Sequence, residues 1–173
     1  MDKIYQKYIT LLKIKQLKAY KLKFENKWSL WYHELFNNDW SMNSYKKLYT
    51  FDNIAEFWLL YNNFISLHNG MFFLMKNNIL PIYEDKNNIK GGYWSIKVPN
   101  NEISKIWLDL SIELIRGNLD KKNIVSGLTI SYKKKFYIIK IWITDKKYNN
   151  LSYLDLNNIN IKKEEILYNN FLN

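Results

Sequence analysis

Short runs of apolar and aromatic residues alternate with polar loops along most of this chain, and only a few longer stretches show helical spacing. Short runs rich in aromatic and β-branched residues are typical of strands. Two of them, at 127–133 and 136–144, are separated by so few residues that they predict a hairpin. The predicted strands lie at 28–33, 46–51, 71–75, 93–98, 127–133, 136–144 and about 164–171.

Helical spacing begins after Asp52, which suits an N-cap, and again at Asn100 or Asn101, from where it continues to Ile115. Apolar residues three and four positions apart share one face of a helix. A shorter third helix is predicted near 148–156. The apolar positions are Ile54, Phe57, Trp58 and Tyr61 in the first helix, and Ile103, Ile106, Trp107, Leu110, Ile112 and Leu114 in the second.

Single helices between groups of strands, with hairpins among the strands, favour an α+β fold with a mainly antiparallel sheet. Residues 23–173 are expected to form this one domain. Residues 1–22 place apolar positions at helical spacing opposite lysines, which predicts an extra basic amphipathic helix or tail. Such a segment packs on the domain or frays, or else contacts RNA or a membrane surface.

The composition limits the classes of function. The chain has a formal net charge of +10 and no cysteine, which excludes disulfides and thiolate metal sites. No apolar run approaches the roughly 20 residues that span a bilayer. The positive charge suits a polyphosphate or RNA partner. Because Lys, Asn, Ile and Tyr, the dominant residues, use AT-rich codons, an AT-rich genome is expected, such as that of a large DNA virus or a protozoan parasite.

The segment PIYEDKNNIKGGYW, residues 81–94, carries the most informative chemistry. Tyr83 offers an electron-rich ring, and the neighbouring Glu84 offers a carboxylate. A flat, positively charged ring such as 7-methylguanine satisfies both, because it stacks on the first and donates two parallel hydrogen bonds to the second. Asp85 is expected to support the loop or to face solvent. Gly91-Gly92 precedes a strand rather than a helix, so it indicates a turn and not a phosphate-binding loop.

An enzymatic function needs a nucleophile with its base, clustered carboxylates or a metal site. The two histidines, His33 and His68, lie in separate segments without metal-ligand spacing. No catalytic constellation is recognisable, so an enzyme acting on RNA is not favoured, and no metal or cofactor is expected.

Several aromatic and acidic motifs follow one another in a distinctive order. They are KWSLWYHELFNNDW at 27–40, TFDNIAEFWLLYNNF at 50–64, the 81–94 segment, ISKIWLDLSIELI at 103–115 and SGLTISYKKKFYIIKIWIT at 126–144. Over about residues 22–145 this order resembles the eukaryotic translation initiation factor 4E family, the mRNA cap-binding proteins. The resemblance implies a curved sheet of about eight strands, with three helices on its convex face and the cap in its concave face.

The resemblance further implies a monomeric cytoplasmic protein (in the host cytoplasm, if viral) that binds the 7-methylguanosine cap and recruits capped mRNA for translation initiation. No membrane association is expected. A repressor or decoy that sequesters caps shares the same pocket and remains an alternative. A general single-strand binder is a further alternative, and it predicts equal affinity for capped and uncapped RNA.

By resemblance, the cap site consists of two stacking rings, Trp40 and Tyr83, with Glu84 reading the guanine and Trp142 touching the N7-methyl group. The family usually has tryptophan at the second ring, so weaker stacking is expected here. From the residues alone, Trp40 is either a core anchor or a ring presented to a ligand, and Trp142 is equally well explained as a residue of the sheet core.

The phosphate groove departs most from the family. Lys133 stands where the family has arginine, and Ile138 stands at a lysine position. Because strands alternate faces with period two, Lys140 shares a face with Trp142 and is expected to replace the missing lysine. Lys135 is a third candidate. The run 133–135 is otherwise a solvated turn.

A second set of residues matches the surface that receives an amphipathic helix from a 4G-type scaffold protein or from a 4E-binding repressor peptide. These residues are Ile54, Trp58, Leu108 and Asp109. Their other interpretation is ordinary packing of helices on the sheet. Leu22-Lys23 replaces a His-Pro pair of the family, which favours a dedicated partner over the ordinary host scaffold.

Overall fold

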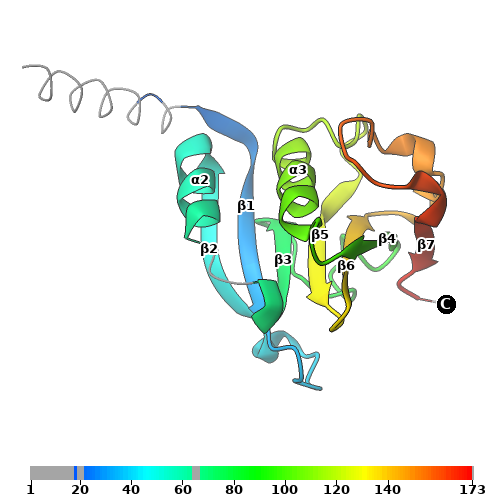
Figure 1. Ribbon diagram of the computed structural model, residues 1–173, viewed down its shortest axis with the longest axis horizontal. Coiled ribbons are helices and arrows are strands. Elements are labelled where there is room, and N and C mark those ends of the chain that lie inside the picture. Colours follow the sequence, from blue (N-terminus) through cyan, green and yellow to red (C-terminus); the bar gives the residue numbers. More distant parts are fainter. Residues whose placement is uncertain (1–17, 19–21, 64–66, 173) are drawn as a thin grey trace, which may run out of the picture.

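Seven strands form one twisted, curved sheet in the order β2-β1-β3-β5-β6-β4-β7, and every pair of neighbours is antiparallel (Figure 1). The computed structural model describes residues 18, 22–63 and 67–172. The strands are β1 (Lys23–His33), β2 (Lys46–Asn53), β3 (Met71–Lys76), β4 (Gly92–Pro99), β5 (Val125–Tyr132), β6 (Phe136–Ile143) and β7 (Leu167–Asn170).

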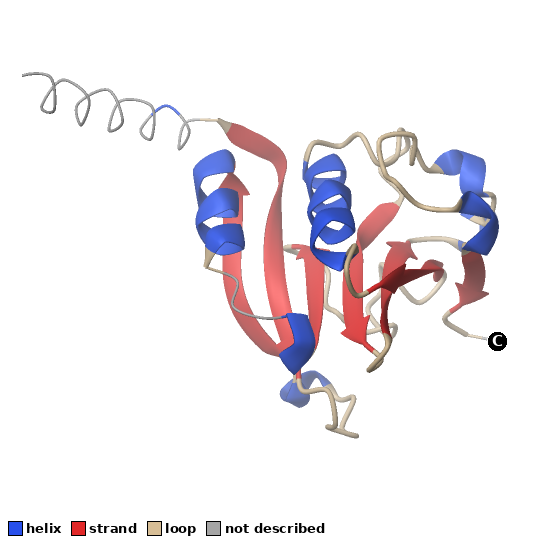
Figure 2. Ribbon diagram, viewed as in Figure 1, coloured by secondary structure: helices blue, strands red, loops and turns tan. Residues whose placement is uncertain are grey.

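Two α-helices, α2 (Ile54–Asn62) and α3 (Ile103–Ile115), cover one face of the sheet (Figure 2). Short 3-10 helices complete the described elements. They are η1 (Met42–Ser44), η2 (Leu67–Asn69), η3 (Lys146–Tyr148), η4 (Leu151–Tyr153) and η5 (Lys163–Glu165). The predicted α+β class with an antiparallel sheet is confirmed, whereas the helix at 1–22 lies outside the described residues apart from Lys18 and Leu22.

Two counts were wrong. Among the described residues the sheet has seven strands rather than about eight, and two α-helices rather than three cover it. The predicted helix near 148–156 is replaced by the turns η3 and η4. Asp145 and Asn150 each accept a hydrogen bond from the backbone N–H two residues later, and this local bonding competes with continuous α-helix.

The helix starts also differ from the prediction. Asn53, not Asp52, caps α2, because its side-chain oxygen accepts the N–H of Glu56 at 2.9 Å. The Asp52 carboxylate instead pairs with Lys23 of β1. The second helix, α3, begins only at Ile103.

The two faces of the sheet bury different side chains because alternate residues of a strand point in opposite directions. Trp28 and Leu30 of β1 join the main core under α2 and α3. Trp31 joins a smaller cluster on the opposite face, together with Phe73, Met75, Ile79 and Trp142. Trp31, Phe73, Thr129 and Lys140 are successive cross-strand partners, so they form a row across this second face, opposite the face that α2 and α3 cover.

Candidate functional site

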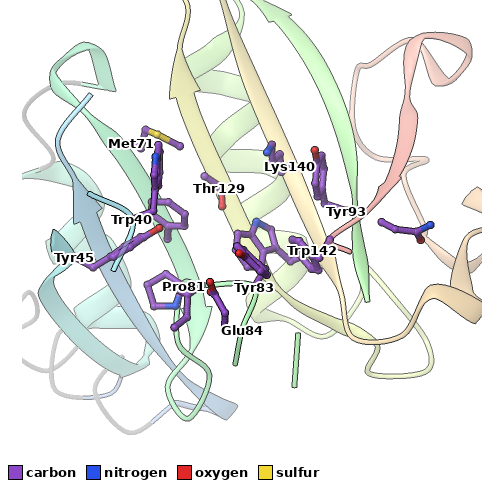
Figure 3. A pocket seen from close by; sticks show the side chains of 14 residues that line it. Trp40, Tyr45, Met71, Pro81, Tyr83, Glu84, Tyr93, Thr129, Lys140 and Trp142 are labelled. Carbon is purple, nitrogen blue, oxygen red and sulfur yellow. The ribbon is translucent and has the colours of Figure 1, made fainter. Parts of the chain in front are cut away.

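A cleft of about 280 Å³ lies on the face of the sheet opposite α2 and α3 (Figure 3). Its floor comes from the strands, and its walls come from the loop before β2, the β3–β4 loop and the chain after β7. The lining residues are Trp40, Tyr45, Met71, Phe73, Pro81, Ile82, Tyr83, Glu84, Tyr93, Thr129, Lys140, Trp142, Asn170 and Phe171. Trp40, Tyr83, Glu84, Trp142 and Lys140, all predicted from the sequence, therefore meet in one place.

Trp40 stands in the loop between β1 and β2, and 51% of it is exposed. One face of its ring stacks on the ring of His33, with 4.4 Å between centroids and 1° between planes. Turn hydrogen bonds shape this loop: Asn37 accepts the N–H of Asp39, and Asp39 accepts that of Ser41. The Ser41 hydrogen bonds lower the pKa of Asp39 below its usual value, and His33 contributes further. Trp40 is thus held out into the cleft rather than folded under the loop.

Tyr83 and Glu84 lie at the exposed tip of the β3–β4 loop, which two side chains organise from below. Asp85 accepts the backbone N–H groups of Leu80 and Asn87 at 3.0 and 2.8 Å. Asn88 is buried and donates to backbone carbonyls of the same loop. Asp85 therefore supports the loop, as the sequence indicated. The hydroxyl of Tyr83 hydrogen-bonds to the Glu84 carboxylate, and this bond, with the carboxylate's charge, raises the pKa of Tyr83.

The loop returns to the sheet at Gly91, where close packing explains the residue. A Cβ on Gly91 would lie 1.7 Å from the carbonyl oxygen of Ile143, so only glycine fits against this strand. The Gly91-Gly92 pair thus leads into β4 at a close approach between strands, and it precedes a strand rather than a helix.

Trp142 forms part of the floor and is buried between Phe73 and Phe171, with ring centroids 6.2 and 4.7 Å away. Its indole Nε1 has no hydrogen-bond partner in the described structure, and the same holds for the buried hydroxyl of Thr129, a neighbouring residue of the cleft. Both atoms are shielded from solvent, and the buried indole nitrogens of Trp28, Trp31 and Trp94 also lack a partner, so these atoms by themselves do not indicate a ligand.

Lys140 faces the same side of the sheet as Trp142, and its Nζ lies 3.9 Å from the ring centre of Tyr93. Burial lowers the pKa of Lys140, and the positive charge of Lys133 lowers it further. Lys133 therefore lies close enough to act on the same region, although it is exposed and does not line the cleft. Lys135 belongs to the exposed hairpin turn and is not brought to the cleft.

The sequence did not single out several lining residues, among them Tyr45, Met71, Thr129 and Phe171. Tyr45 is the most informative: burial, followed by the negative charges of Glu84 and Asp39, raises its pKa to about 12. Met71 and Thr129 were predicted to lie on strands. Because alternate residues of a strand share a face, placing both on the face that carries Trp142 could have identified them as lining residues. Phe171 follows β7 directly, where its backbone N–H bonds to Gly91.

The predicted partner residues gather on the outer side of the two helices. Trp58 of α2 is 39% exposed, Ile54 is one turn before it and half-buried, and Leu108 of α3 is also half-buried. Asp109 pairs with Lys105 at 2.5 Å. Tyr61 of α2 donates to the backbone carbonyl of Ser104 in α3 at 3.2 Å, which links the two helices. The helices therefore leave a large ring and an acidic group accessible on the side away from the cleft.

The described part of the chain gives two further findings, one on metal clusters and one on membrane-spanning helices. No three His, Asp or Glu residues there are grouped to hold a metal ion. None of the helices described is both long and apolar enough to cross a bilayer.

Residues 23–170 match the family model described as eukaryotic initiation factor 4E. The eukaryotic translation initiation factor 4E1 of Drosophila melanogaster is 32% identical over 134 residues, which cover 73% of this chain and 51% of that protein. The Homo sapiens eukaryotic translation initiation factor 4E is 31% identical over 134 residues, covering 70% of this chain and 60% of that protein. The chain thus spans about half to three fifths of the length of these relatives.

Two solved structures share the fold. Caenorhabditis elegans eIF4E-3, in complex with the 4E-binding protein Mextli and a cap analog, has a TM-score of 0.75 at 24% identity, covering 86% of this chain and 91% of that chain. Ascaris suum eIF4E-3, in complex with m7G cap, has a TM-score of 0.74 at 25% identity, covering 87% of this chain and 91% of that chain.

Proposed function

Because the chain belongs to the eukaryotic initiation factor 4E family, we propose that its cleft binds the 7-methylguanosine cap of mRNA and thereby recruits capped mRNA for translation initiation. The observation that carries this proposal is the meeting of two exposed rings, Trp40 and Tyr83, with the carboxylate of Glu84 in one cleft. A base inserted between the two rings would stack on both and reach the carboxylate with its edge.

Each part of a methylated cap has a counterpart in this cleft. The positive charge on the methylated base strengthens stacking on aromatic faces, by about 0.5–2 kcal/mol for each face. The guanine N1–H and N2 amine form two parallel donors, which the Glu84 carboxylate accepts. Trp142, buried in the floor, offers an apolar surface for the N7-methyl group. An unmethylated, neutral guanine would keep the hydrogen bonds and lose the charge-dependent part of the stacking.

The phosphate chain would run from the base toward Lys140 and Lys133. Lys140 is the only lysine that lines the cleft as described, and Lys133 adds positive charge at its edge. A lysine is a point charge rather than a bidentate fork, so phosphate contacts should be sensitive to salt.

Retention of one RNA in capped and uncapped forms tests the proposal. A radiolabelled transcript is mixed with the full chain and filtered at moderate salt, and the retained fraction is measured for each form. The capped form is expected to bind more tightly, because the uncapped form offers the cleft no charged base. Equal retention of both forms would contradict cap recognition and would favour a general single-strand binder.

Lys140→Ala is expected to weaken binding of 7-methyl-GTP by roughly 10-fold or more, the scale of a lost hydrogen bond to a charged group. Binding of 7-methyl-GMP should change less, because the monophosphate extends less far toward the lysine. Fluorescence titration at two salt concentrations measures both. Lys121→Ala, which removes an exposed lysine outside the cleft, is the matched control. Equal losses for the two ligands would place Lys140 away from the phosphates.

For the partner, we propose that Ile54, Trp58, Leu108 and Asp109 receive an amphipathic helix from a 4G-type scaffold or from a 4E-binding repressor peptide. The partly exposed ring of Trp58 supports the proposal of a partner site here, because large aromatic side chains commonly contribute most of the binding energy of such interfaces. Asp109 adds an acidic group that suits a basic residue of the partner. The surface lies on the opposite side of the sheet from the cleft, so both ligands fit at once.

Trp58→Ala is expected to reduce capture of a 4G-type peptide by about 2 kcal/mol or more, roughly 30-fold, while cap binding stays unchanged. Peptide capture on beads and titration with 7-methyl-GTP are measured on the same preparation. Leu167→Ala removes an exposed apolar side chain at the far edge of the sheet and serves as the control. A loss of cap affinity or of folding in Trp58→Ala would show that this tryptophan belongs to the core.

A further inference from the structure

His33 is the last residue of β1 and is fully buried behind the cleft, where the cap-binding proposal gives it no role. Its ring lies parallel to the ring of Trp40 at 4.4 Å. The ring of Tyr45, another residue of the cleft wall, approaches it at 4.8 Å. His33 thus contacts two lining residues without lining the cleft itself.

Both ring nitrogens of His33 lie 2.8 Å from backbone carbonyl oxygens, Nδ1 from that of Glu34 and Nε2 from that of Asp39. A carbonyl oxygen only accepts hydrogen bonds, and a neutral imidazole has only one N–H. Only the doubly protonated imidazolium can donate to both oxygens at once. The two carbonyls stand at the beginning and the end of loop 34–39, and the ring therefore ties the two ends of the loop together.

The position of His33 itself is fixed by the sheet. His33 pairs with Met71 of β3, whereas Trp40 lies outside the strands and is half-exposed. A tryptophan on a loop without such support would sample other rotamers and would lose affinity when a ligand ordered it. Among the titratable residues, Asp39 interacts with His33 through its charge and Tyr45 contacts its ring, whereas Glu34 contacts it through its backbone carbonyl. The carboxylate of Asp39 lies near enough to His33 for the two charges to interact.

We propose that His33 is a positioning residue for Trp40. Its two N–H groups hold loop 34–39 closed, and its ring stacks on one face of the indole so that the other face is available to the ligand. The effect on affinity rests on the proposed cap binding, whereas the arrangement of the loop does not. His33 is therefore predicted to hold Trp40 in its ligand-binding orientation before a ligand binds.

Binding of 7-methyl-GTP to substituted proteins tests this role. His33→Phe keeps a flat ring behind the indole and removes both N–H donors, so we expect affinity to fall roughly 3- to 10-fold, the scale of ordering one rotamer-rich side chain. In the Trp40→Ala background the same substitution should have no further effect, because His33 acts through Trp40. An effect of His33→Phe that persists undiminished without Trp40 would overturn the proposal.

Nitrogen NMR of the ligand-free wild-type protein gives a second test that needs neither a variant nor cap binding. We expect His33 to show two protonated ring nitrogens and Trp40 to give one sharp indole N–H signal. In His33→Phe the Trp40 signal should broaden or double. A single protonated nitrogen in His33 together with an unchanged Trp40 signal in the variant would refute the positioning role. A wild-type protein that shows these spectra but binds 7-methyl-GTP and GTP with equal affinity would refute cap binding and leave the positioning role intact.

Discussion

Trp40→Ala is expected to remove most of the preference for methylated over unmethylated guanine nucleotides. The positive charge on the methylated base strengthens its stacking on an aromatic face. Each face contributes about 0.5–2 kcal/mol, which corresponds to about 2- to 30-fold in affinity. Total affinity should fall further, because the base also loses a stacking surface. Titration with 7-methyl-GTP and GTP, followed by the fluorescence of the remaining tryptophans, measures the ratio.

Phe36→Ala is the matched control for Trp40→Ala. Phe36 is an aromatic residue of the same loop, 84% exposed and not part of the cleft, so its removal should leave both affinities unchanged. Tyr83→Ala should behave like Trp40→Ala, and Tyr83→Phe should keep the preference because the ring remains. A Trp40→Ala protein with the wild-type preference would exclude this ring from the site.

Glu84→Gln is expected to weaken binding of 7-methyl-GTP by about 1.5–3 kcal/mol, roughly 10- to 150-fold. The uncharged amide accepts fewer hydrogen bonds, and its NH₂ group would point at a donor of the guanine edge. Glu84 is exposed at the tip of its loop, and Asp85 and Asn88 hold that loop from below. Thermal stability should therefore stay nearly unchanged. Isothermal titration and a thermal melt measure the two quantities.

Glu164→Gln makes the same change of charge at an exposed glutamate outside the cleft and should bind like the wild type. If Glu84→Gln also bound like the wild type, the carboxylate would not contact the guanine. A large fall in melting temperature would instead show that Glu84 holds the loop together.

Much of the fold was predictable because its signals are local. The hairpin of β5 and β6 follows from two apolar runs separated by a short lysine turn, and α2 follows from apolar residues at helical spacing after Asn53. The predicted third helix failed for a local reason as well. Asp145 and Asn150 each accept the backbone N–H two residues later and so begin two separate 3-10 turns, η3 and η4, in place of one continuous α-helix.

The candidate site was predictable where one side chain carries its own chemistry. The pair of Tyr83 and Glu84 suggests a cationic ring by itself, and the family resemblance added Trp40 and Trp142. Lys140 was expected to reach the cleft because it shares a face of the sheet with Trp142, and it lines the cleft. Lys135 lies in the exposed hairpin turn and does not line it.

Residues such as Tyr45, His33 and Phe171 were not predictable because their roles depend on contacts between distant segments. Tyr45 lines the cleft only because the β1–β2 loop folds against β3, where its ring meets Phe73. His33 looks like an isolated histidine until loop 34–39 brings the carbonyl of Asp39 to its ring. Phe171 reaches Trp142 because β7 pairs with β4 at the edge of the sheet. The origin from an AT-rich genome stays a prediction.

The most direct test of cap recognition is the ratio of the affinities of the wild-type chain for 7-methyl-GTP and GTP, measured by titration under identical salt. With two aromatic faces that each contribute about 0.5–2 kcal/mol for a charged base, the methylated nucleotide should bind roughly 5-fold to several hundred-fold more tightly. Equal affinities would contradict the account, because Trp40, Tyr83 and Glu84 would then not form a site for a positively charged guanine.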